Sequence, residues 1–331
     1  MALAETAERC YNITQAYLSL PGHTSIIEET QDAIRLTKTY LLADIFQRWN
    51  PFGGEIAFSY NGGKDCQVLL MLYLGCLWEF FLESIADSQY PFRYQKFPLK
   101  QLSTVYINQV ETFETLDKFI KNTTARYCLS LYESPRNQTS MQHAFQSYLD
   151  LRQETQAIVI GIRHTDPFGS DLKCIEETDS DWPRFMRLQP ILHWRLSNIW
   201  SMLLYSGEEI CGLYGLGFTS IGSVNGTVRN PYLRNSSEVE PALRNRNDVS
   251  FEAAATTTTT TNGEPAVDVK NHFLWEIEHA YGKQTVDKHV NVSAISESDA
   301  RLIFAQDSNS FYPGWYLIND SWERAGRISK K

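Results

Sequence analysis

The stretch FSYNGGKDCQVLL, residues 58–70, is the part of the sequence that decides the fold. The residues from Ile56 to Tyr60 are typical of a short buried strand, and the apolar run from Val68 onward is typical of a long helix. Only Asn-Gly-Gly-Lys-Asp stands between them, which leaves no room for an ordinary polar turn. The sequence therefore predicts a strand that passes through a short glycine loop, residues 60–65, directly into a helix.

The composition of the glycine loop indicates what it binds. Gly62 and Gly63 have no Cβ atom, so their backbone can approach a ligand closely. The first N–H groups of the following helix are unpaired and favour an anion, and Lys64 adds a positive charge at phosphate distance. We predict a pyrophosphate site that does not follow the Walker pattern G-x-x-x-x-G-K-[ST]. A tight turn with solvated Lys64 and Asp65 is the alternative.

The composition limits the class of protein. The chain has 331 residues and a net charge of −9, which argues against a nucleic-acid surface held by phosphate contacts. The N-terminus carries charges where a signal peptide needs an apolar core, and the six cysteines form no C-x-x-C pair. We expect a cytoplasmic monomer with reduced thiols, no zinc site, and no membrane or nucleic-acid partner.

The pattern of apolar segments predicts an α/β fold. Strands are expected at 55–60, 102–108 and 156–162, with helices at 66–84, 111–125 and 139–153. This alternation predicts a Rossmann-like, mostly parallel sheet flanked by helices, with the glycine loop at its carboxyl edge. The segment 66–82 is about as long as a membrane span, but it contains Gln67 and Glu79 and is expected to be a buried helix.

We predict a single domain over residues 1–331. Residues 1–50 are expected to form N-terminal helices, and residues 51–233 the α/β core. Residues 234–270 are poor in apolar side chains and include six consecutive threonines, so we predict a disordered insertion; a phosphorylated regulatory loop is the alternative. Residues 271–331 regain aromatic residues and are expected to be an ordered C-terminal extension.

The glycine loop resembles the S-G-G-K-D-S pyrophosphate loop of the superfamily that cleaves ATP at the α-phosphate, which includes phosphoadenylylsulfate reductases and tRNA-thiolating enzymes. Asn61 replaces the first serine of that pattern and Cys66 the last. Over nearly its whole length the chain is similar to the fungal FAD synthases, or FMN adenylyltransferases. The resemblance rests on SYNGGKDCQVLL (59–70), IVIGIRHTDPFG (158–169), TDSDWPRFMRLQPILHW (178–194), GLYGLGFTSIG (212–222) and YPGWYLINDSWERAGRI (312–328).

A second loop, GIRHTDPFG, follows a predicted strand and is expected at the same sheet edge. There Arg163 suits phosphate charge and Asp166 suits Mg²⁺, while an Asp-Pro turn explains Asp166 equally well. The resemblance implies that Asp166 is catalytic, with Mg²⁺ bound near it. It also implies that Arg163 and His164 contact the flavin.

The segment TDSDWPRF sets Asp179 close to Trp182. A flavin ring has a flat apolar face and a polar edge with an N–H donor, which a carboxylate beside an aromatic ring matches. A helix N-cap is the alternative for Asp179. The resemblance favours Asp179 over Asp181, and it makes the C-terminal extension part of the flavin site. The aromatic walls that it implies there are Tyr312, Trp315 and Tyr316.

The resemblance implies that the phosphate of FMN attacks the α-phosphorus of ATP to give FAD and pyrophosphate. Such a reaction needs positioning and charge neutralisation rather than a strong base. Arg324 and Arg327 are expected to neutralise the phosphates, although terminal arginines are often merely solvated. The expected catalytic residues are Asn61, Asp65, Asp166, Arg324 and Arg327. The expected ATP site comprises Ser59, Tyr60, Asn61, Gly62, Gly63, Lys64, Asp65, Ile107, Gly161 and Arg163.

Two other functions remain open from the sequence. A phosphoadenylylsulfate reductase uses the same loop but needs a reactive cysteine near its C-terminus, whereas the last cysteine here is Cys211. A non-catalytic flavin or nucleotide sensor would keep the fold and lose the charged residues of the site.

Overall fold

The computed structural model describes residues 2–22, 24–86, 94–109, 111–136, 140–235 and 290–328. The predicted disordered insertion therefore lies outside the described residues, apart from its first two positions, and that prediction stays untested. The same holds for the start of the predicted C-terminal extension.

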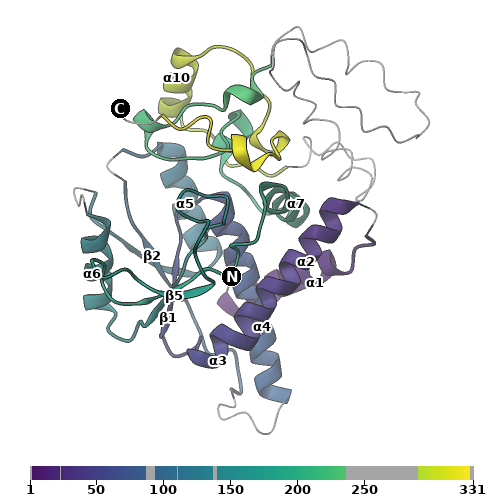
Figure 1. Cartoon of the computed structure of the whole chain (residues 1–331), viewed down its shortest axis with the longest axis vertical. Coiled ribbons are helices and arrows are strands. Elements are labelled where there is room, and N and C mark those ends of the chain that lie inside the picture. Colours follow the sequence, from purple (N-terminus) through teal and green to yellow (C-terminus); the bar gives the residue numbers. More distant parts are fainter. Residues whose placement is uncertain are drawn as a thin grey trace.

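A single mixed sheet forms the centre of the molecule (Figure 1). Its six strands are ordered β3-β2-β1-β4-β6-β5, and every neighbouring pair is parallel except β5 with β6. The strands are β1 (Ile56–Ser59), β2 (Leu102–Tyr106), β3 (Leu129–Glu133), β4 (Ala157–Val159), β5 (Ile175–Glu177) and β6 (Met186–Leu188). The predicted α/β fold is confirmed, and β1, which leads into the glycine loop, is central.

Helices cover both faces of this sheet. The described helices are α1 (Leu3–Leu18), α2 (Ser25–Thr39), a π-helical turn (Tyr40–Ile45), α3 (Phe46–Arg48), α4 (Lys64–Ala86), α5 (Glu114–Arg126), α6 (Met141–Leu151), α7 (Leu196–Ser206) and α10 (Glu297–Gln306). Of these, α10 lies apart from the sheet at one end of the molecule (Figure 1). Because successive residues of a strand point to opposite faces, Phe58 joins the large core with α1, α2, α4 and α7. Its neighbour Ala57 joins the smaller core beside Phe145 and Tyr148 of α6.

Helix α4 is long and apolar enough to span a membrane by length and composition, but 72% of its most apolar window is buried inside the protein. Its polar side chains have partners: Gln67 donates a hydrogen bond to the carbonyl of Glu209 at 2.8 Å. Glu79 pairs with Lys38 at 2.7 Å. The prediction of a buried core helix is confirmed.

Two stretches far apart in sequence meet at one end of the molecule. Figure 1 shows residues near 210–235 in green and the C-terminal residues in yellow lying together there. Backbone bridges join Thr227 to Arg327 and Arg234 to Phe311. The C-terminal segment, residues 311–328, also contains two 3₁₀ turns, Gly314–Tyr316 and Asp320–Trp322. These contacts fix the end of the chain beside the sheet.

Candidate active site

The glycine loop joins the end of β1 to the start of α4 without an intervening turn. Gly62 has φ of +73°, and a Cβ atom there would lie 2.7 Å from Cγ1 of Ile120 on α5. Only glycine tolerates both the left-handed backbone and the close packing. Gly63 has no such backbone constraint, and it lines a cavity. The two glycines thus have different roles, which the sequence alone does not distinguish.

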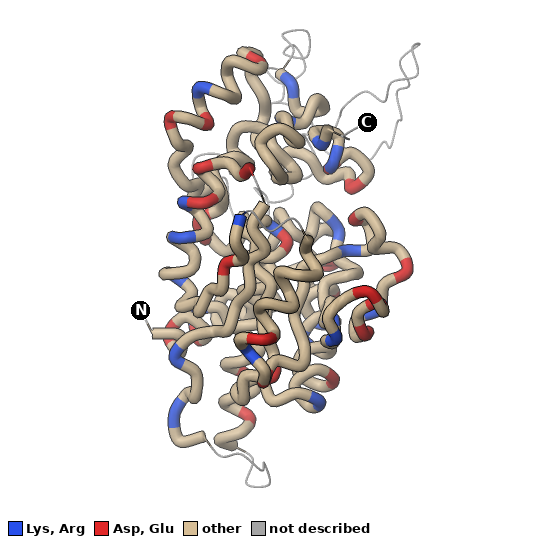
Figure 2. The backbone as a smooth tube through the Cα atoms, turned by 90° about the vertical axis from the view of Figure 1, so that its left-hand side faces the viewer, with Lys and Arg blue, Asp and Glu red and all other residues tan. Residues whose placement is uncertain are grey.

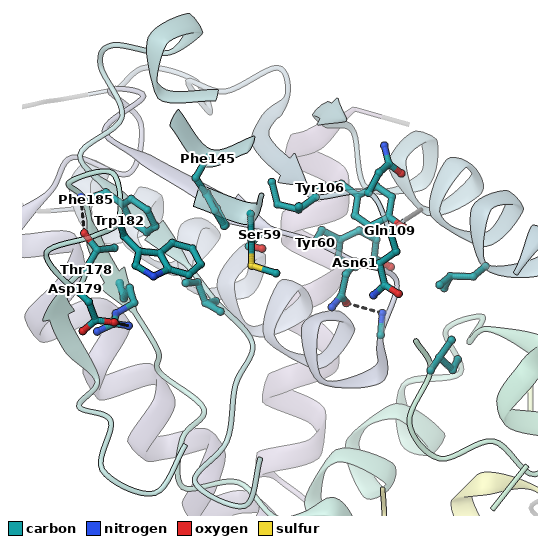
Figure 3. A pocket seen from close by; sticks show the side chains of 18 residues that line it. Ser59, Tyr60, Asn61, Tyr106, Gln109, Phe145, Thr178, Asp179, Trp182 and Phe185 are labelled. Atoms are coloured by element: carbon teal, nitrogen blue, oxygen red, sulfur yellow. Dashed lines mark hydrogen bonds and ion pairs between the residues drawn. The ribbon is translucent and has the colours of Figure 1, made fainter. Parts of the chain in front are cut away.

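Two backbone N–H groups of the loop already have side-chain partners. The N–H of Gly63 donates to Asn61 Oδ1 at 2.9 Å, and the N–H of Lys64 donates to the hydroxyl of Tyr214 at 3.0 Å. Figure 3 shows the first of these contacts at the edge of the cavity. An anion takes the Gly63 N–H only when the Asn61 side chain turns away. Asn61, which stands in place of the usual serine, is therefore an internal cap of the loop.

A cavity of about 380 Å³ runs from the glycine loop to the turn between β5 and β6 (Figure 3). Seven of the residues that line it were predicted as site residues: Ser59, Tyr60, Asn61, Gly63, Ile107, Asp179 and Trp182. The others were not predicted: Tyr106, Asn108, Gln109, Leu116, Met141, Phe145, Ile160, Thr178, Phe185, Arg187 and Ile221. The two predicted ends of the site, the phosphate loop and the flavin pair, therefore open into one space.

The far end of the cavity combines aromatic rings with one carboxylate. The ring of Phe145 lies 6.1 Å from that of Trp182 and 5.3 Å from that of Phe185. Asp179 Oδ2 lies 3.3 Å from Arg187 Nη1, and the Asp179 side chain is 67% exposed. Its carbonyl accepts the N–H of Trp182 at 2.9 Å in a turn that no helix follows, so the helix N-cap alternative is wrong.

Arg163, which follows β4, is fully buried among carboxylates. Its Nε lies 2.8 Å from Asp65 Oδ1, and its Nη1 lies 3.1 Å from Asp320 Oδ1. Its Nη2 lies 3.4 Å from Asp166 Oδ1 and also pairs with Glu323. The guanidinium expected to meet phosphate or flavin is thus compensated by protein carboxylates.

The side chain of Lys64 is also buried, at 2% exposed. Its Nζ lies 2.9 Å from Asp65 Oδ2 and pairs with Glu323. The solvated alternative for Lys64 is therefore wrong, and the ammonium group does not open into the cavity that Gly63 lines. Two cations face four carboxylates in this buried charge cluster, which consists of Lys64, Asp65, Arg163, Asp166, Asp320 and Glu323.

The pKa values of two carboxylates in the buried charge cluster are shifted in opposite directions. Burial acts to raise the pKa of Asp65, but Arg163 and Lys64 outweigh burial and lower that pKa below its usual value. At Asp166, burial is the largest influence, and with the nearby charge of Asp65 it raises the pKa despite Arg163. Asp65 is therefore held ionised, whereas the surroundings favour a proton on Asp166.

Asp166 also has a local structural role. Its Oδ2 accepts the N–H of Arg163 at 2.9 Å, and its carbonyl accepts the N–H of Gly169 at 2.9 Å. The Asp-Pro turn considered from the sequence is therefore present. His164 is exposed, places Nδ1 2.9 Å from the Gly169 carbonyl, and does not line the cavity. Gly161 packs on α4, since a Cβ atom there would lie 2.9 Å from Cys66 Sγ.

Arg324 and Arg327 differ from the buried cations. Among the described residues, neither forms an ion pair with a carboxylate. Arg327 donates to Thr227 Oγ1 at 3.2 Å, and its guanidinium fills the space of a Cβ atom at Gly222, next to a cavity residue. Burial lowers the pKa of Arg327, and the positive charge of Arg324 lowers it further. Figure 2 shows arginine and lysine positions in blue beside the C-terminal end.

The aromatic residues of the C-terminal segment lie outside the cavity. Trp315 is 3% exposed and packs edge-on against Trp200, with ring centroids 6.3 Å apart. Tyr312 donates to Asn235 Oδ1 at 2.8 Å, and its ring lies 5.5 Å from that of Tyr316. The structure does not bring Tyr312, Trp315 and Tyr316 together with the cavity that Asp179 and Trp182 line.

Comparison with known proteins agrees with this geometry. Residues 55–229 match the phosphoadenosine phosphosulfate reductase domain. The flavin adenine dinucleotide synthase of Saccharomyces cerevisiae is 52% identical over 334 residues, which cover 99% of each chain.

Two solved structures of Candida glabrata FMN adenylyltransferase resemble the chain throughout. The complex with FAD and inorganic pyrophosphate has a TM-score of 0.82 and 47% identity, covering 99% of this chain and 100% of that one. The complex with FMN and the ATP analogue AMPCPP has a TM-score of 0.78 and 46% identity, with the same coverage. The chain therefore belongs to the FAD synthase family, within the phosphoadenosine phosphosulfate reductase-like superfamily.

Proposed function

We infer that the chain transfers AMP from ATP to FMN and so produces FAD and pyrophosphate. The observation that carries this conclusion is the continuous cavity that joins the glycine loop to the aromatic end beside Asp179. Family membership supports it, because related enzymes have been solved with FAD and pyrophosphate and with FMN and an ATP analogue.

The arrangement suits attack by a phosphate that is already an anion. FMN brings its own nucleophile, so the protein needs to align the two substrates and to stabilise charge on the phosphates. The flavin ring lies against Trp182 and Phe185, with its polar edge toward Asp179. The triphosphate lies at Gly63, where the start of α4 favours negative charge. Attack and departure of pyrophosphate then take place beside the glycine loop.

The cations that meet the developing charge are Arg324 and Arg327. Lys64 and Arg163 are already compensated by buried carboxylates, whereas the two C-terminal arginines have no carboxylate partner among the residues that the structure describes. A planar guanidinium can also bind two phosphate oxygens at once.

Mg²⁺ is the proposed metal cofactor. Among the described residues, no three His, Cys, Asp or Glu side chains are placed so that together they could hold a metal ion. Mg²⁺ is usually bound by one or two carboxylates together with substrate phosphates and water, so this does not conflict. Asp166 fits as that carboxylate: its side chain is 20% exposed, and it belongs to a cluster in which negative charge is in excess. The ion would supply charge neutralisation on the phosphates.

The test is incubation of the protein with FMN, ATP and Mg²⁺, followed by detection of FAD and pyrophosphate. Riboflavin should not replace FMN, because it lacks the attacking phosphate. Sulfite release from phosphoadenylylsulfate without FAD formation would overturn the proposal. The structure disfavours that reductase activity: Cys211 is fully buried, and burial raises its pKa to about 12, so it is a poor nucleophile.

A further inference from the structure

One side chain connects the C-terminal segment to the two loops of the site. Glu323 is 4% exposed, and its two carboxylate oxygens have different partners. Oε1 pairs with the ammonium of Lys64, at the start of α4. Oε2 pairs with the guanidinium of Arg163, after β4. Glu323 thus contacts, at the same time, the two segments that follow the neighbouring parallel strands β1 and β4.

The backbone around Glu323 is equally fixed. Its carbonyl accepts a hydrogen bond from Thr219 Oγ1 at 2.5 Å, and the carbonyl of Trp322 accepts one from Asn230 Nδ2 at 2.8 Å. Arg324 follows directly in sequence. The position of Arg324 is therefore set by a residue whose side chain and main chain are both held.

Both the backbone and the side chain of Lys64 are held by residues that lie much later in the sequence. Its N–H donates to the Tyr214 hydroxyl, and its ammonium pairs with Glu323. Because that ammonium is buried and Lys64 does not line the cavity, its charge serves the contact between α4 and the C-terminal segment rather than the ligand. This explains why a loop that binds phosphate buries its own lysine.

We propose that Glu323 is a positioning residue for FAD synthesis. By pairing with Lys64 and Arg163, it holds the C-terminal segment against the glycine loop and so places Arg324 and Arg327 at the phosphates. The proposal rests on the proposed function, but it makes a separate claim. Wild-type protein that forms no FAD would refute the function, whereas only the variants below test Glu323.

Glu323→Gln is the primary variant, because it keeps the shape and removes the charge. We expect kcat for FAD formation to fall about 10-fold or more, since misplacement of the reacting groups by a fraction of an ångström is costly. The KM for ATP and for FMN should change little, and Glu323→Asp should recover part of the loss. Hydrogen exchange of residues 319–328 should become faster.

Glu208→Gln is the matched control. Glu208 is a buried glutamate that pairs with Arg9 and accepts the hydroxyl of Tyr127 at 2.7 Å, away from the cavity. Glu208→Gln should lower Tm about as much as Glu323→Gln does, but it should leave kcat unchanged. Both variants are assayed at a temperature well below their Tm. If the two variants lose stability alike and both keep wild-type kcat, Glu323 only stabilises the fold and the proposal fails.

A second comparison keeps the test decisive if Glu323→Gln is poorly stable. Lys64→Met should lower Tm strongly, because it leaves buried carboxylates with one cation fewer. Adding Glu323→Gln to Lys64→Met should restore most of the lost Tm, since both members of the pair are then gone.

The kinetics of Glu323→Gln alone could also contradict the proposal. A lower KM for ATP with unchanged or higher kcat would show that Glu323 competes with phosphate for Lys64 and would overturn the proposal.

Discussion

The hydroxyl of Tyr214 accepts a hydrogen bond from the backbone N–H of Lys64 at 3.0 Å, although the two residues are 150 positions apart. Tyr214 is 2% exposed and packs edge-on against Trp200, with ring centroids 5.3 Å apart. The first turn of α4 is therefore held by the part of the chain that precedes the described C-terminal segment. The geometry of the glycine loop therefore depends on residues that lie much later in the sequence.

The two loop glycines should fail in different ways when they are replaced. Gly62→Ala should lower the free energy of unfolding by about 1–3 kcal/mol, because it strains a left-handed backbone and crowds Ile120. Gly63→Val should instead block ATP binding, since its branch would occupy the space beside Asn61 in which we propose that the phosphates bind. Denaturant unfolding and ATP titration separate the two effects. ATP binding that survives in Gly63→Val would contradict the assignment.

The far end of the cavity, where Asp179 lies, allows two neighbouring aspartates, Asp179 and Asp181, to be compared. Asp179→Asn should raise the KM for FMN about 10-fold, because a hydrogen bond to a charged group is lost. The KM for ATP should stay the same. Asp181→Asn is the control, since Asp181 is exposed and does not line the cavity. Equal effects of the two substitutions in steady-state kinetics would show that Asp179 does not contact the flavin.

The sequence predicts the middle of the sheet, strands β1, β2 and β4, but neither β3 at one edge nor β5 and β6 at the other. Strands β1, β2 and β4 are apolar runs of the kind that a parallel sheet buries. Strands β5 and β6 have three residues each and contain the charged pair Glu176 and Arg187, which lie opposite each other in the ladder. Such short polar strands form because a neighbouring strand is present to pair with them, so no local sequence pattern predicts them.

The site shows the same division. The glycine loop and Asp179 carry local signals of composition, and both line the cavity. The burial of Lys64 depends on Glu323, which lies 259 positions away, and a glutamate followed directly by an arginine normally indicates a solvated surface. The sequence therefore predicts seven of the residues that line the cavity, but neither Glu323 nor the eleven other lining residues.

Replacing Asp166 by asparagine should maintain or raise the stability of the protein and lower its activity. Its pKa is raised in the folded protein above the value of about 3.8 that applies when it is unfolded. The folded state therefore binds the proton more tightly, and stability is lost as pH rises through this interval. Asp166→Asn has no proton to lose, so at pH 7 its Tm should equal or exceed that of the wild type.

The advantage of Asp166→Asn should disappear as pH falls below about 4, because the wild-type carboxyl is then protonated as well. FAD formation should fall at every pH, since an amide is a poor Mg²⁺ ligand. Thermal unfolding across pH, combined with kinetics at several Mg²⁺ concentrations, checks both parts. A lower Tm for Asp166→Asn at pH 7 would show that the ionised carboxylate stabilises the fold.

Arg327 provides the sharpest test of the charge assignment. Its guanidinium is half-buried beside Thr227 and Gly222, and within the described chain no carboxylate compensates it. If it meets charge that builds mainly in the transition state, Arg327→Ala should lower kcat by about 100-fold or more with little change in the KM for ATP. Arg327→Lys should recover only part of the loss, because a point charge cannot replace the planar fork.

The control for Arg327 is Arg301 on α10, which is 83% exposed and pairs with Glu297 at 3.4 Å. Arg301→Ala should leave kcat unchanged and alter the free energy of unfolding by no more than about 0.5 kcal/mol. Steady-state kinetics of the three arginine variants then decide whether Arg327 stabilises charge in the transition state or is merely solvated. A wild-type kcat in Arg327→Ala would make Arg327 a solvated terminal residue, and the neutralisation of phosphate charge would fall to Arg324 and Mg²⁺.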